Sequence, residues 1–510
     1  MALKPTIDVQ VELSGAGGGW TSLAADVVQS ASVTIKHGIM GGGPSDRVAS
    51  TGTCTFTLQN STRNSGGLLG YYSRYHANRR TGWDLGIGCR VRMTDPDTAT
   101  VSTQFIGRID VIEPEPGVKR ARTVKVTAVD WMDAAARWAL TPAIGEQVNQ
   151  RADQIITAII AVMPEAPIAV DYDAGSDTYP YALDTSPQNK GTVLGEFAKL
   201  AASEVGFIYV KAAGTLRFES RSSRLVNTTS VWTIPDTDLD GITLPSSRDE
   251  VLNTVRCITH PRTVDTSLTS VVYSQANEII LNASEAKTLM GPYRDPDTGN
   301  EIGATNIQAL VAGTDYVAVN GAGVDSTADI SIVTTAGPAG VRFVVTNNAA
   351  EPLTLTLLQL RGSSIFDYGT TEFQASNASS ITSYGEHAVI FDMPYQADAN
   401  VGQAACDYFL GVYETPFAVV GSPSVFGKSN ALITQILTRD IGDRITLSET
   451  VTGANGQYFI NGRELTVTPG GYLHAVYQVA PAVDPFGAPN YWQLGTVGVG
   501  ELGTKTYLAW

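Results

Sequence analysis

Three glycine-rich stretches contain the residue types of phosphate-binding loops, in which backbone N–H groups surround an anion. Residues 421–429 come close to the pattern G-x-x-x-x-G-K-[ST], but the spacer is one residue too long and we expect a strand, not a helix, to follow. Residues 498–503 match G-x-G-x-x-G, yet only seven residues follow, too few for the helix that would hold a pyrophosphate. Residues 38–43 match neither pattern. We interpret all three as turns and expect no cofactor.

The residues most often used in catalysis and metal binding are dispersed along the chain. The five histidines stand alone, without the H-E-x-x-H spacing of a metalloprotease. The four cysteines contain no C-x-x-C pair and no local signature of a nucleophile, so we expect buried, reduced thiols. We predict no catalytic residue and no metal site. A pair of glycosidase carboxylates brought together by the fold would not show in the sequence, and we rank that alternative low.

One stretch combines positive charge with aromatic side chains. Residues 60–83 contain four arginines, one histidine, three tyrosines and one tryptophan, and no acidic residue. Such a composition is typical of loops that bind nucleic acid, but arginine and tyrosine are also enriched at protein interfaces. We favour docking on an acidic face of an identical or neighbouring subunit. The candidate interface residues are Arg74, Tyr75, Arg79, Arg80 and Trp83, with Trp492 and Trp510 in an apolar C-terminal tail.

The composition excludes some classes of function. The chain has 510 residues, 43% hydrophobic and 16% charged, which predicts three or four domains of ordinary size. With 34 basic and 50 acidic residues the net charge is −16, so the protein does not hold DNA by its overall field. No stretch approaches the roughly 20 apolar residues of a membrane helix, and no signal peptide is recognised. We expect synthesis in a host cytoplasm.

Helical periodicity is rare, so most of the chain is expected to be strand and loop. Helices are predicted at about residues 151–163, at 192–205 with Gly206 as a left-handed terminator, at 400–410, and in a short piece after Asp130. Strands are predicted at residues 7–13, 32–36, 54–58, 90–94, 123–129, 353–360 and 432–437. The protein is therefore predicted to be mainly β with a small α/β part.

An internal similarity predicts two related β-barrels. Residues 88–93 (GCRVRM) resemble residues 442–447 (GDRITL), and in both copies a Phe-Ile pair follows the arginine at the same distance, at residues 105–106 and 459–460. We expect a first barrel domain at 1–145, an α/β domain at 146–230, and a discontinuous second barrel at 231–304 and 386–480. An inserted β-sandwich is expected at 305–385 and a docking tail at 481–510.

Four stretches resemble the siphophage minor tail proteins that form the baseplate hub at the tail tip. Residues 55–60, the basic stretch and Gly88-Cys-Arg-Val-Arg92 are similar to the family's strand, open loop and G-x-x-V-R strand. Residues 104–110 with 124–130 are similar to its F-x-G-x-[IV]-D and V-x-V-x-A-x-D pair, and residues 200–218 to its helix followed by G-x-x-Y…G-x-L-x-F. Residues 440–447 with 491–494 and 508–510 are similar to its GD-x-[IV] strand and W-x-L-G…L-A-[YW] end. The basic stretch departs from the family, which is often richer in Pro and Ser there.

The resemblance implies a structural virion protein at the tail tip. It implies two barrels of the tail-hub type in each chain and a homotrimer whose six barrels form a ring, joining a sixfold tube to threefold tip proteins. The implied partners are the distal tail protein and tail tube, the tape-measure protein, and tip fibre or receptor-binding proteins. Phage DNA would pass through the lumen without specific binding. Two alternatives stay open: a receptor- or carbohydrate-binding tail protein that uses the inserted sandwich, and, ranked lower, a cell-wall hydrolase.

Overall fold

The computed structural model describes residues 4–482, apart from residues 16, 42, 117–120, 141–143, 184–190, 244–250, 266, 296, 338, 415–420, 452 and 454. Strands make up 44% of the structure and helices 15%, which confirms that the protein is mainly β. The described residues form several sheets, none of which closes into a barrel. No helix among them is long and apolar enough to cross a membrane.

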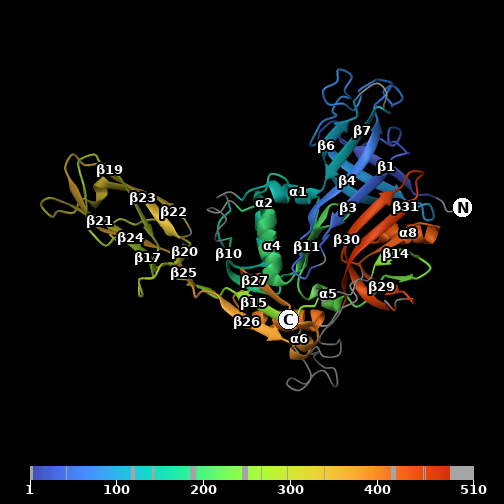
Figure 1. Ribbon diagram of the computed structural model, residues 1–510. Coiled ribbons are helices and arrows are strands. Elements are labelled where there is room, and N and C mark those ends of the chain that lie inside the picture. Colours follow the sequence, from blue (N-terminus) through green and yellow to red (C-terminus); the bar gives the residue numbers. More distant parts are fainter. Residues whose placement is uncertain are drawn as a thin grey trace.

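The largest sheet is built from the two ends of the chain (Figure 1). Its N-terminal half contains β1 (Thr6–Val11), β2 (Thr21–Ser22), β3 (Val33–Gly38), β4 (Ser50–Gln59), β5 (Gly88–Thr94), β6 (Val101–Pro114) and β7 (Thr123–Val129). Its C-terminal half contains β13 (Trp232–Pro235), β14 (Leu239–Thr243), β28 (Gly421–Phe426), β29 (Arg444–Ser448), β30 (Asn455–Val467) and β31 (Leu473–Pro481). The strand order is β14-β28-β31-β30-β3-β4-β7-β6-β5-β1-β2, with β29 also beside β30 and β13 beside β29. One hydrophobic core includes buried side chains from both halves.

The two halves contain six corresponding strands in the same order along the chain. The corresponding pairs are β1 and β13, β3 and β14, β4 and β28, β5 and β29, β6 and β30, and β7 and β31. In the N-terminal half the antiparallel pairing runs in the order β3-β4-β7-β6-β5. In the C-terminal half the corresponding strands pair antiparallel in the same order, β14-β28-β31-β30-β29. The first strand pairs with the fourth in both halves, antiparallel for β1 and parallel for β13. The fold therefore contains an internal duplication.

A β-bulge fixes the register of this duplication. The β6–β7 pairing shifts between Ile109 and Val111, and the β30–β31 pairing shifts between Ile460 and Gly462. In both halves the isoleucine carbonyl before the bulge accepts a hydrogen bond from a glycine N–H, Gly86 at 2.7 Å and Gly442 at 2.9 Å. Ile109 therefore corresponds to Ile460, whereas the sequence alignment matched Ile106 with Ile460. The sequence similarity matched the correct strands in the wrong register. Similar residues recur along a strand, and only the position of the bulge distinguishes one register from another.

The two halves meet where β3 pairs with β30. Their register runs from Val33 opposite Val467 to Gly38 opposite Gly462. Gly38 has φ 103°, and a Cβ there would lie 2.5 Å from the Asn461 carbonyl oxygen, so this contact requires glycine. Beside the junction, the buried Arg463 guanidinium donates to Gln104 Oε1 of β6 at 2.9 Å.

Residues 432–437 were predicted as a strand, and this prediction is wrong. They lie in helix α8 (Asn430–Thr438), which connects β28 to β29 and begins where the Ser429 hydroxyl accepts a hydrogen bond from the Leu432 N–H at 3.3 Å. Leu432, Ile433, Ile436 and Leu437 are all buried, at the spacing of one helical face. A short run of branched apolar residues fits a strand or a helix equally well, and the cap decides between them. A helix does follow residues 421–429, but Gly421–Phe426 is a paired strand rather than an open anion-binding loop.

An α/β layer links the two halves in sequence and covers one side of the junction. It contains α1 (Trp131–Arg137), β8 (Gln147–Arg151), α2 (Ala152–Val162), β9 (Ala169–Tyr172), β10 (Thr178–Ala182), α4 (Val193–Glu204), β11 (Phe207–Val210), β12 (Thr215–Glu219) and α5 (Ser223–Val226). The predicted helices are confirmed as α1, α2 and α4. The left-handed residue that ends α4 is Val205, with φ 56°, rather than Gly206. Gly206 is needed instead for close approach, because a Cβ there would lie 2.4 Å from the Glu219 carbonyl oxygen.

A second α/β layer packs beside the first. It contains β15 (Thr254–Thr259), β26 (Thr371–Ser376), β27 (Ala388–Met393), α6 (Ala378–Tyr384) and α7 (Ala399–Tyr413), and α7 confirms the helix predicted at 400–410. The Arg47 guanidinium, from the connection between β3 and β4, lies over the rings of Phe207 at 4.8 Å and Phe409 at 5.0 Å and so contacts both layers. All four cysteines are buried free thiols, as expected.

A small β unit projects from the second layer as an arm (Figure 1). It contains β16 (Arg262–Val264), β17 (Val271–Ser274), β18 (Ile279–Leu281), β19 (Ala286–Pro292), β20 (Gly303–Thr305), β21 (Tyr316–Asn320), η2 (Thr327–Asp329), β22 (Ile330–Ala336), β23 (Gly340–Asn347), β24 (Leu353–Arg361) and β25 (Ser363–Asp367). Its core is separate from that of the large sheet. The expected start of the insertion at residue 305 falls inside this unit, because β16 to β20 pair with strands that follow it.

Candidate functional site

The basic stretch forms the connection between β4 and β5, and we call residues 60–86 the basic aromatic loop. Its inner side is anchored on the core by Tyr72 and Trp83, which are both fully buried. Their rings meet edge to face with centroids 5.0 Å apart, and Trp83 Nε1 donates to the Tyr72 carbonyl at 2.9 Å. Trp83 therefore offers no surface to a partner. It supports the loop from within.

A buried carboxylate holds the base of the loop. Asp26 is 2% exposed and accepts hydrogen bonds from the Ser65 N–H at 2.6 Å, the Ser65 hydroxyl and the Tyr72 hydroxyl. Burial, followed by the hydrogen bond to Asp26, raises the pKa of Tyr72 well above its ordinary value. Arg80 Nη1 also donates to the Tyr72 hydroxyl at 2.9 Å. Arg80 thus belongs to this anchor.

The outer side of the loop carries charge that is only partly neutralised. Arg74 Nε lies 2.6 Å from one oxygen of Asp84, and Arg79 Nη1 lies 3.2 Å from the other. The Leu85 backbone N–H, and then the two guanidinium groups, lower the pKa of Asp84. Because two arginines share one carboxylate, the loop keeps a net positive charge. The Tyr75 side chain beside them is 91% exposed.

An open groove lies between this outer side and strand β6. It has a volume of about 450 Å³ and is lined by Ser73, Arg74, Tyr75, His76 and Leu85 from the loop and by Asp110, Val111, Ile112 and Pro114 from β6. Two of the lining side chains are apolar and exposed, Leu85 with 40% and Val111 with 37% of its surface accessible. A groove that combines apolar side chains, arginine and tyrosine has the composition of a protein-binding surface.

Five of the predicted interface residues lie in this loop, and two of them, Arg74 and Tyr75, line the groove. Arg74, Tyr75 and Arg79 are on the outer surface, Arg80 is partly covered, and Trp83 is in the core. Trp492 and Trp510 lie outside the described residues. Sequence reasoning missed Asp84, which stands one residue beyond the stretch that had no acid, and Asp26, which is far away in sequence. It also missed the contribution of β6, since only the fold places residues 110–114 beside the loop.

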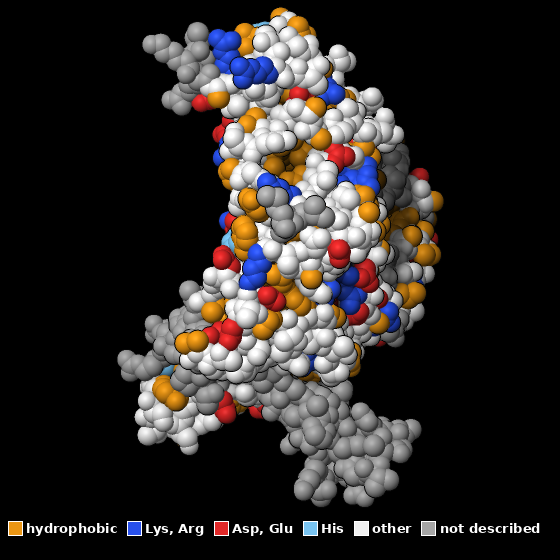
Figure 2. All heavy atoms as spheres, turned by 90° about the vertical axis from the view of Figure 1, so that its right-hand side faces the viewer, with side chains coloured by type: hydrophobic (Ala, Val, Ile, Leu, Met, Phe, Trp, Pro, Cys, Tyr) orange, Lys and Arg blue, Asp and Glu red, His pale blue; other side chains and the backbone are white. Residues whose placement is uncertain are grey.

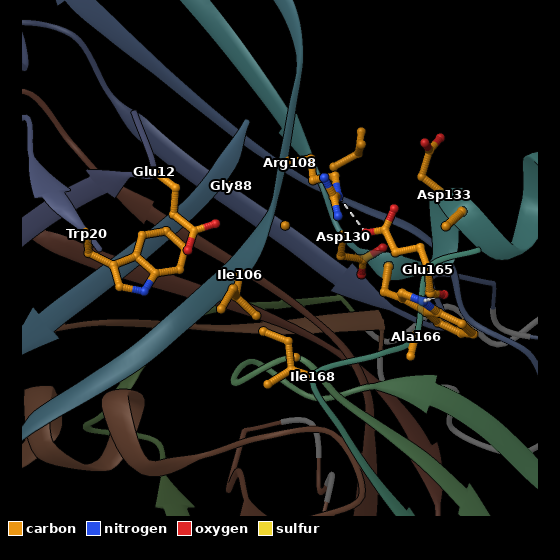
Figure 3. A pocket seen from close by; sticks show the side chains of 15 residues that line it. Glu12, Trp20, Gly88, Ile106, Arg108, Asp130, Asp133, Glu165, Ala166 and Ile168 are labelled. Atoms are coloured by element: carbon orange, nitrogen blue, oxygen red, sulfur yellow. Dashed lines mark hydrogen bonds and ion pairs between the residues drawn. The ribbon is translucent and has the colours of Figure 1, made fainter. Parts of the chain in front are cut away.

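A second pocket tests the glycosidase alternative. This pocket of about 240 Å³ lies between the large sheet and the first α/β layer, and four carboxylates line it (Figure 3). Glu165 forms an ion pair with Arg108 at 2.5 Å, and Asp133 forms one with Arg137 at 2.9 Å. The Glu12 and Asp130 carboxylates accept backbone hydrogen bonds from Gly17 and Met132. Each of these carboxylates has an ion-pair or hydrogen-bond partner within the protein.

The charge distribution agrees with a protein-binding role better than with nucleic-acid binding. Figure 2 shows lysine and arginine side chains interspersed with aspartate and glutamate side chains over one face of the molecule, without a continuous basic surface. Among the described residues, no group of three or more His, Cys, Asp or Glu side chains is placed to hold a metal ion.

Comparison with known proteins identifies the fold. No protein-family model matches the chain, and no curated protein sequence matches it. The fold is similar to that of the 43 kDa tail protein of prophage MuSo2 from Shewanella oneidensis, with a TM-score of 0.50 and 11% identity over 94% of this chain and 98% of that one. It is also similar to a tail protein from Neisseria meningitidis MC58, with a TM-score of 0.51 and 10% identity over 95% of this chain and 98% of that one. The chain therefore shares the fold of these two tail proteins over nearly its whole length.

Proposed function

We propose that this chain is a structural component of a phage virion, the trimeric hub at the distal end of a siphophage tail. The observation that carries the proposal is the internal duplication within the large sheet. Three copies of a chain with two corresponding halves present six similar units, which lets a threefold assembly meet a sixfold tube. We take each half as one unit of the hub ring, corresponding to the two barrels expected from the sequence. The fold shared with two tail proteins supports the proposal, whereas the siphophage assignment rests on the sequence resemblance.

The proposed partners follow from this placement. One face of the ring would contact the distal tail protein and tail tube, with the tape-measure protein in the lumen, and the other would carry tip fibres or receptor-binding proteins. DNA would pass through without specific binding, in keeping with a net charge of −16. The basic aromatic loop, with Arg74, Tyr75 and Arg79 on its surface, would serve contacts between protein subunits.

The test combines stoichiometry with location. We expect mass photometry of the purified chain to give a trimer, and gold-labelled antibodies to mark the distal end of intact tails. A chain that stays monomeric at high concentration and is absent from tail tips would contradict the hub proposal.

One observation favours a second role, receptor or glycan binding by the arm. The arm projects away from the large sheet (Figure 1), and its outer strands expose Met290 and Val333, which are 71% and 65% accessible. Deleting residues 262–367 should then abolish adsorption while leaving tail assembly intact. Clearing of cell walls in a zymogram would instead support the hydrolase alternative.

A further inference from the structure

Two of the four buried cysteines lie at one contact between a strand and a helix in the second α/β layer. Cys257 lies within β15, and Cys406 lies on helix α7, which packs against this strand. Both side chains are fully buried and belong to the same hydrophobic core. The other two cysteines, Cys54 and Cys89, lie in the core of the large sheet.

A glycine allows helix α7 to approach β15 closely. A Cβ at Gly402 of α7 would lie 2.7 Å from Thr259 Cγ2 of β15, so a side chain at this position would hold the helix away from the sheet. Cys406 follows Gly402 by one helical turn, and Cys257 precedes Thr259 by two residues on the same buried face of the strand. Four residues of helix rise about 6 Å and two residues of strand about 7 Å, so the cysteines are as well aligned as Gly402 and Thr259.

Hydrogen bonds place the two thiols beside each other. Cys406 Sγ donates to the Phe373 carbonyl at 3.4 Å, and Phe373 of β26 stands directly opposite Cys257 in the strand register. The Cys257 thiol in turn donates to Cys406 Sγ. This hydrogen bond raises the pKa of Cys257 and lowers the pKa of Cys406. Cys406 is therefore the more readily ionised and the more reactive thiol of the pair.

We propose that Cys257 and Cys406 form a disulfide when the chain enters an oxidising medium. The oxidant is a small-molecule disulfide such as oxidised glutathione. The Cys406 thiolate attacks one sulfur of the oxidant and expels one glutathione thiolate, and the Cys257 thiolate then attacks Cys406 Sγ and expels the second. Two electrons pass from the cysteines to the oxidant, and the two glutathione thiolates take up the two protons that the cysteines lose.

The disulfide fastens the base of the arm to the body of the protein. Strand β15 leads into the arm, and α7 begins after the chain has returned from the arm through β26 and β27. Residues 258–405, which include the whole arm, therefore lie within the loop that the disulfide closes. A cross-link across such a long loop restricts the unfolded chain and so stabilises the folded layer.

The proposed place in a virion gives this reaction a setting. A cytoplasm keeps thiols reduced, whereas the surface of a released particle is exposed to an oxidising medium. The chain is then assembled as a dithiol and gains the disulfide after release. This timing rests on the proposed function, but the reaction itself depends only on the contact between β15 and α7.

Counting thiols tests the reaction in the purified full-length chain. The folded protein is incubated with an excess of oxidised over reduced glutathione, then unfolded in guanidinium and alkylated with N-ethylmaleimide. We expect two of the four cysteines to escape alkylation, and peptide mapping to join Cys257 to Cys406. Because both thiols are buried, the reaction requires local opening of α7, so it is repeated in urea below the unfolding transition, where opening is faster. Cys406→Ala should keep all of its remaining thiols, whereas the matched control Cys54→Ala should still form the disulfide.

Four alkylated cysteines under both conditions would overturn the proposal, and so would a disulfide between Cys54 and Cys89 in place of the expected one. As a second measurement, oxidation should slow hydrogen exchange of the α7 backbone amides at least about tenfold in the wild type and leave it unchanged in Cys257→Ala. Equal exchange in the oxidised and reduced wild type would contradict the stabilising role. These outcomes are independent of the hub proposal, because mass photometry measures the trimer separately.

Discussion

Asp130 allows a quantitative test of the structure near the junction of the large sheet and the first α/β layer. It follows β7 and begins helix α1, where its carboxylate accepts a hydrogen bond from the Met132 N–H at 3.0 Å. The residue is only 6% exposed. Burial raises the pKa of this carboxyl from 3.8 to about 7, although the Gly52 and Met132 backbone N–H groups oppose the shift. In the folded protein Asp130 is therefore largely protonated below neutral pH.

The perturbation is Asp130→Asn, which mimics the protonated carboxyl and keeps a good helix N-cap. Unfolding returns the wild-type carboxyl to its ordinary pKa, so the unfolded state loses the proton first as the pH rises. The contribution of Asp130 to the stability of the wild type therefore falls between about pH 4 and pH 7 and is constant above that window. A shift of about three units corresponds to about 4 kcal/mol. The asparagine variant lacks this loss and should gain up to about 4 kcal/mol relative to wild type between pH 4 and pH 8.

The assay is urea-induced unfolding of both proteins at several values between pH 4 and pH 8, followed by tryptophan fluorescence. The matched control is Asp133→Asn in the same helical turn, where a partly exposed carboxylate pairs with Arg137 at 2.9 Å. Losing that ion pair should cost about 1 kcal/mol or less. A stability difference between Asp130→Asn and wild type that stays constant across the pH range would refute the burial argument.

Further predictions concern packing, and two of them have a matched control. Gly206→Ala should destabilise the protein by about 1–3 kcal/mol in urea unfolding, because its Cβ would lie 2.4 Å from the Glu219 carbonyl oxygen. Gly195→Ala in helix α4, where the nearest atom is 3.5 Å away, should instead stabilise it by about 0.5–1 kcal/mol. Arg463→Ala should cost at least about 3 kcal/mol by leaving a cavity and by removing the donor to Gln104 Oε1 beside the β3–β30 junction, and an unchanged unfolding midpoint would contradict that role. Trp83→Ala should cost about 3–5 kcal/mol in the same assay, whereas Tyr75→Ala should stay within about 0.5 kcal/mol of wild type and alter only assembly.

Local patterns in the sequence predicted the regular elements well. Helices α1, α2, α4 and α7 follow apolar spacing with clear start or stop residues, such as the Thr192 cap of α4. Helix α8 was missed because its apolar run is short and fits a strand as well, although the hydroxyl of Ser429 caps its start. The role of Gly206 was predicted wrongly for a different reason. A glycine in the sequence indicates that a side chain is not tolerated at that position. Only the structure shows that the cause is the strand packed against Gly206, which occupies the space that a Cβ would need.

The candidate site depended on contacts that no local pattern contains. Arginine and tyrosine at residues 71–80 drew attention to the loop, yet the composition could not tell that Trp83 faces the core and Tyr75 faces solvent. The partner acids Asp26 and Asp84 lay outside the stretch that was considered. The internal similarity indicated a duplication, but it matched similar residue types instead of the two bulges, and so gave the wrong register. Strands β3 and β30 are more than 400 residues apart in the sequence. Their pairing depends on how the whole core packs, so no local sequence pattern predicts it.

If the chain is the proposed trimeric hub, the duplication accounts for a change of symmetry from six to three. In the N-terminal half the connection between β3 and β4 is short, covering residues 39–49. The corresponding connection between β14 and β28 covers residues 244–420 and contains the second α/β layer and the arm. In the proposed trimer the six halves would therefore form a nearly sixfold ring, while only three of them carry an arm. The threefold character would arise from where the insertion occurs and not from any distortion of the ring. Removing the arm should accordingly leave trimer formation unchanged.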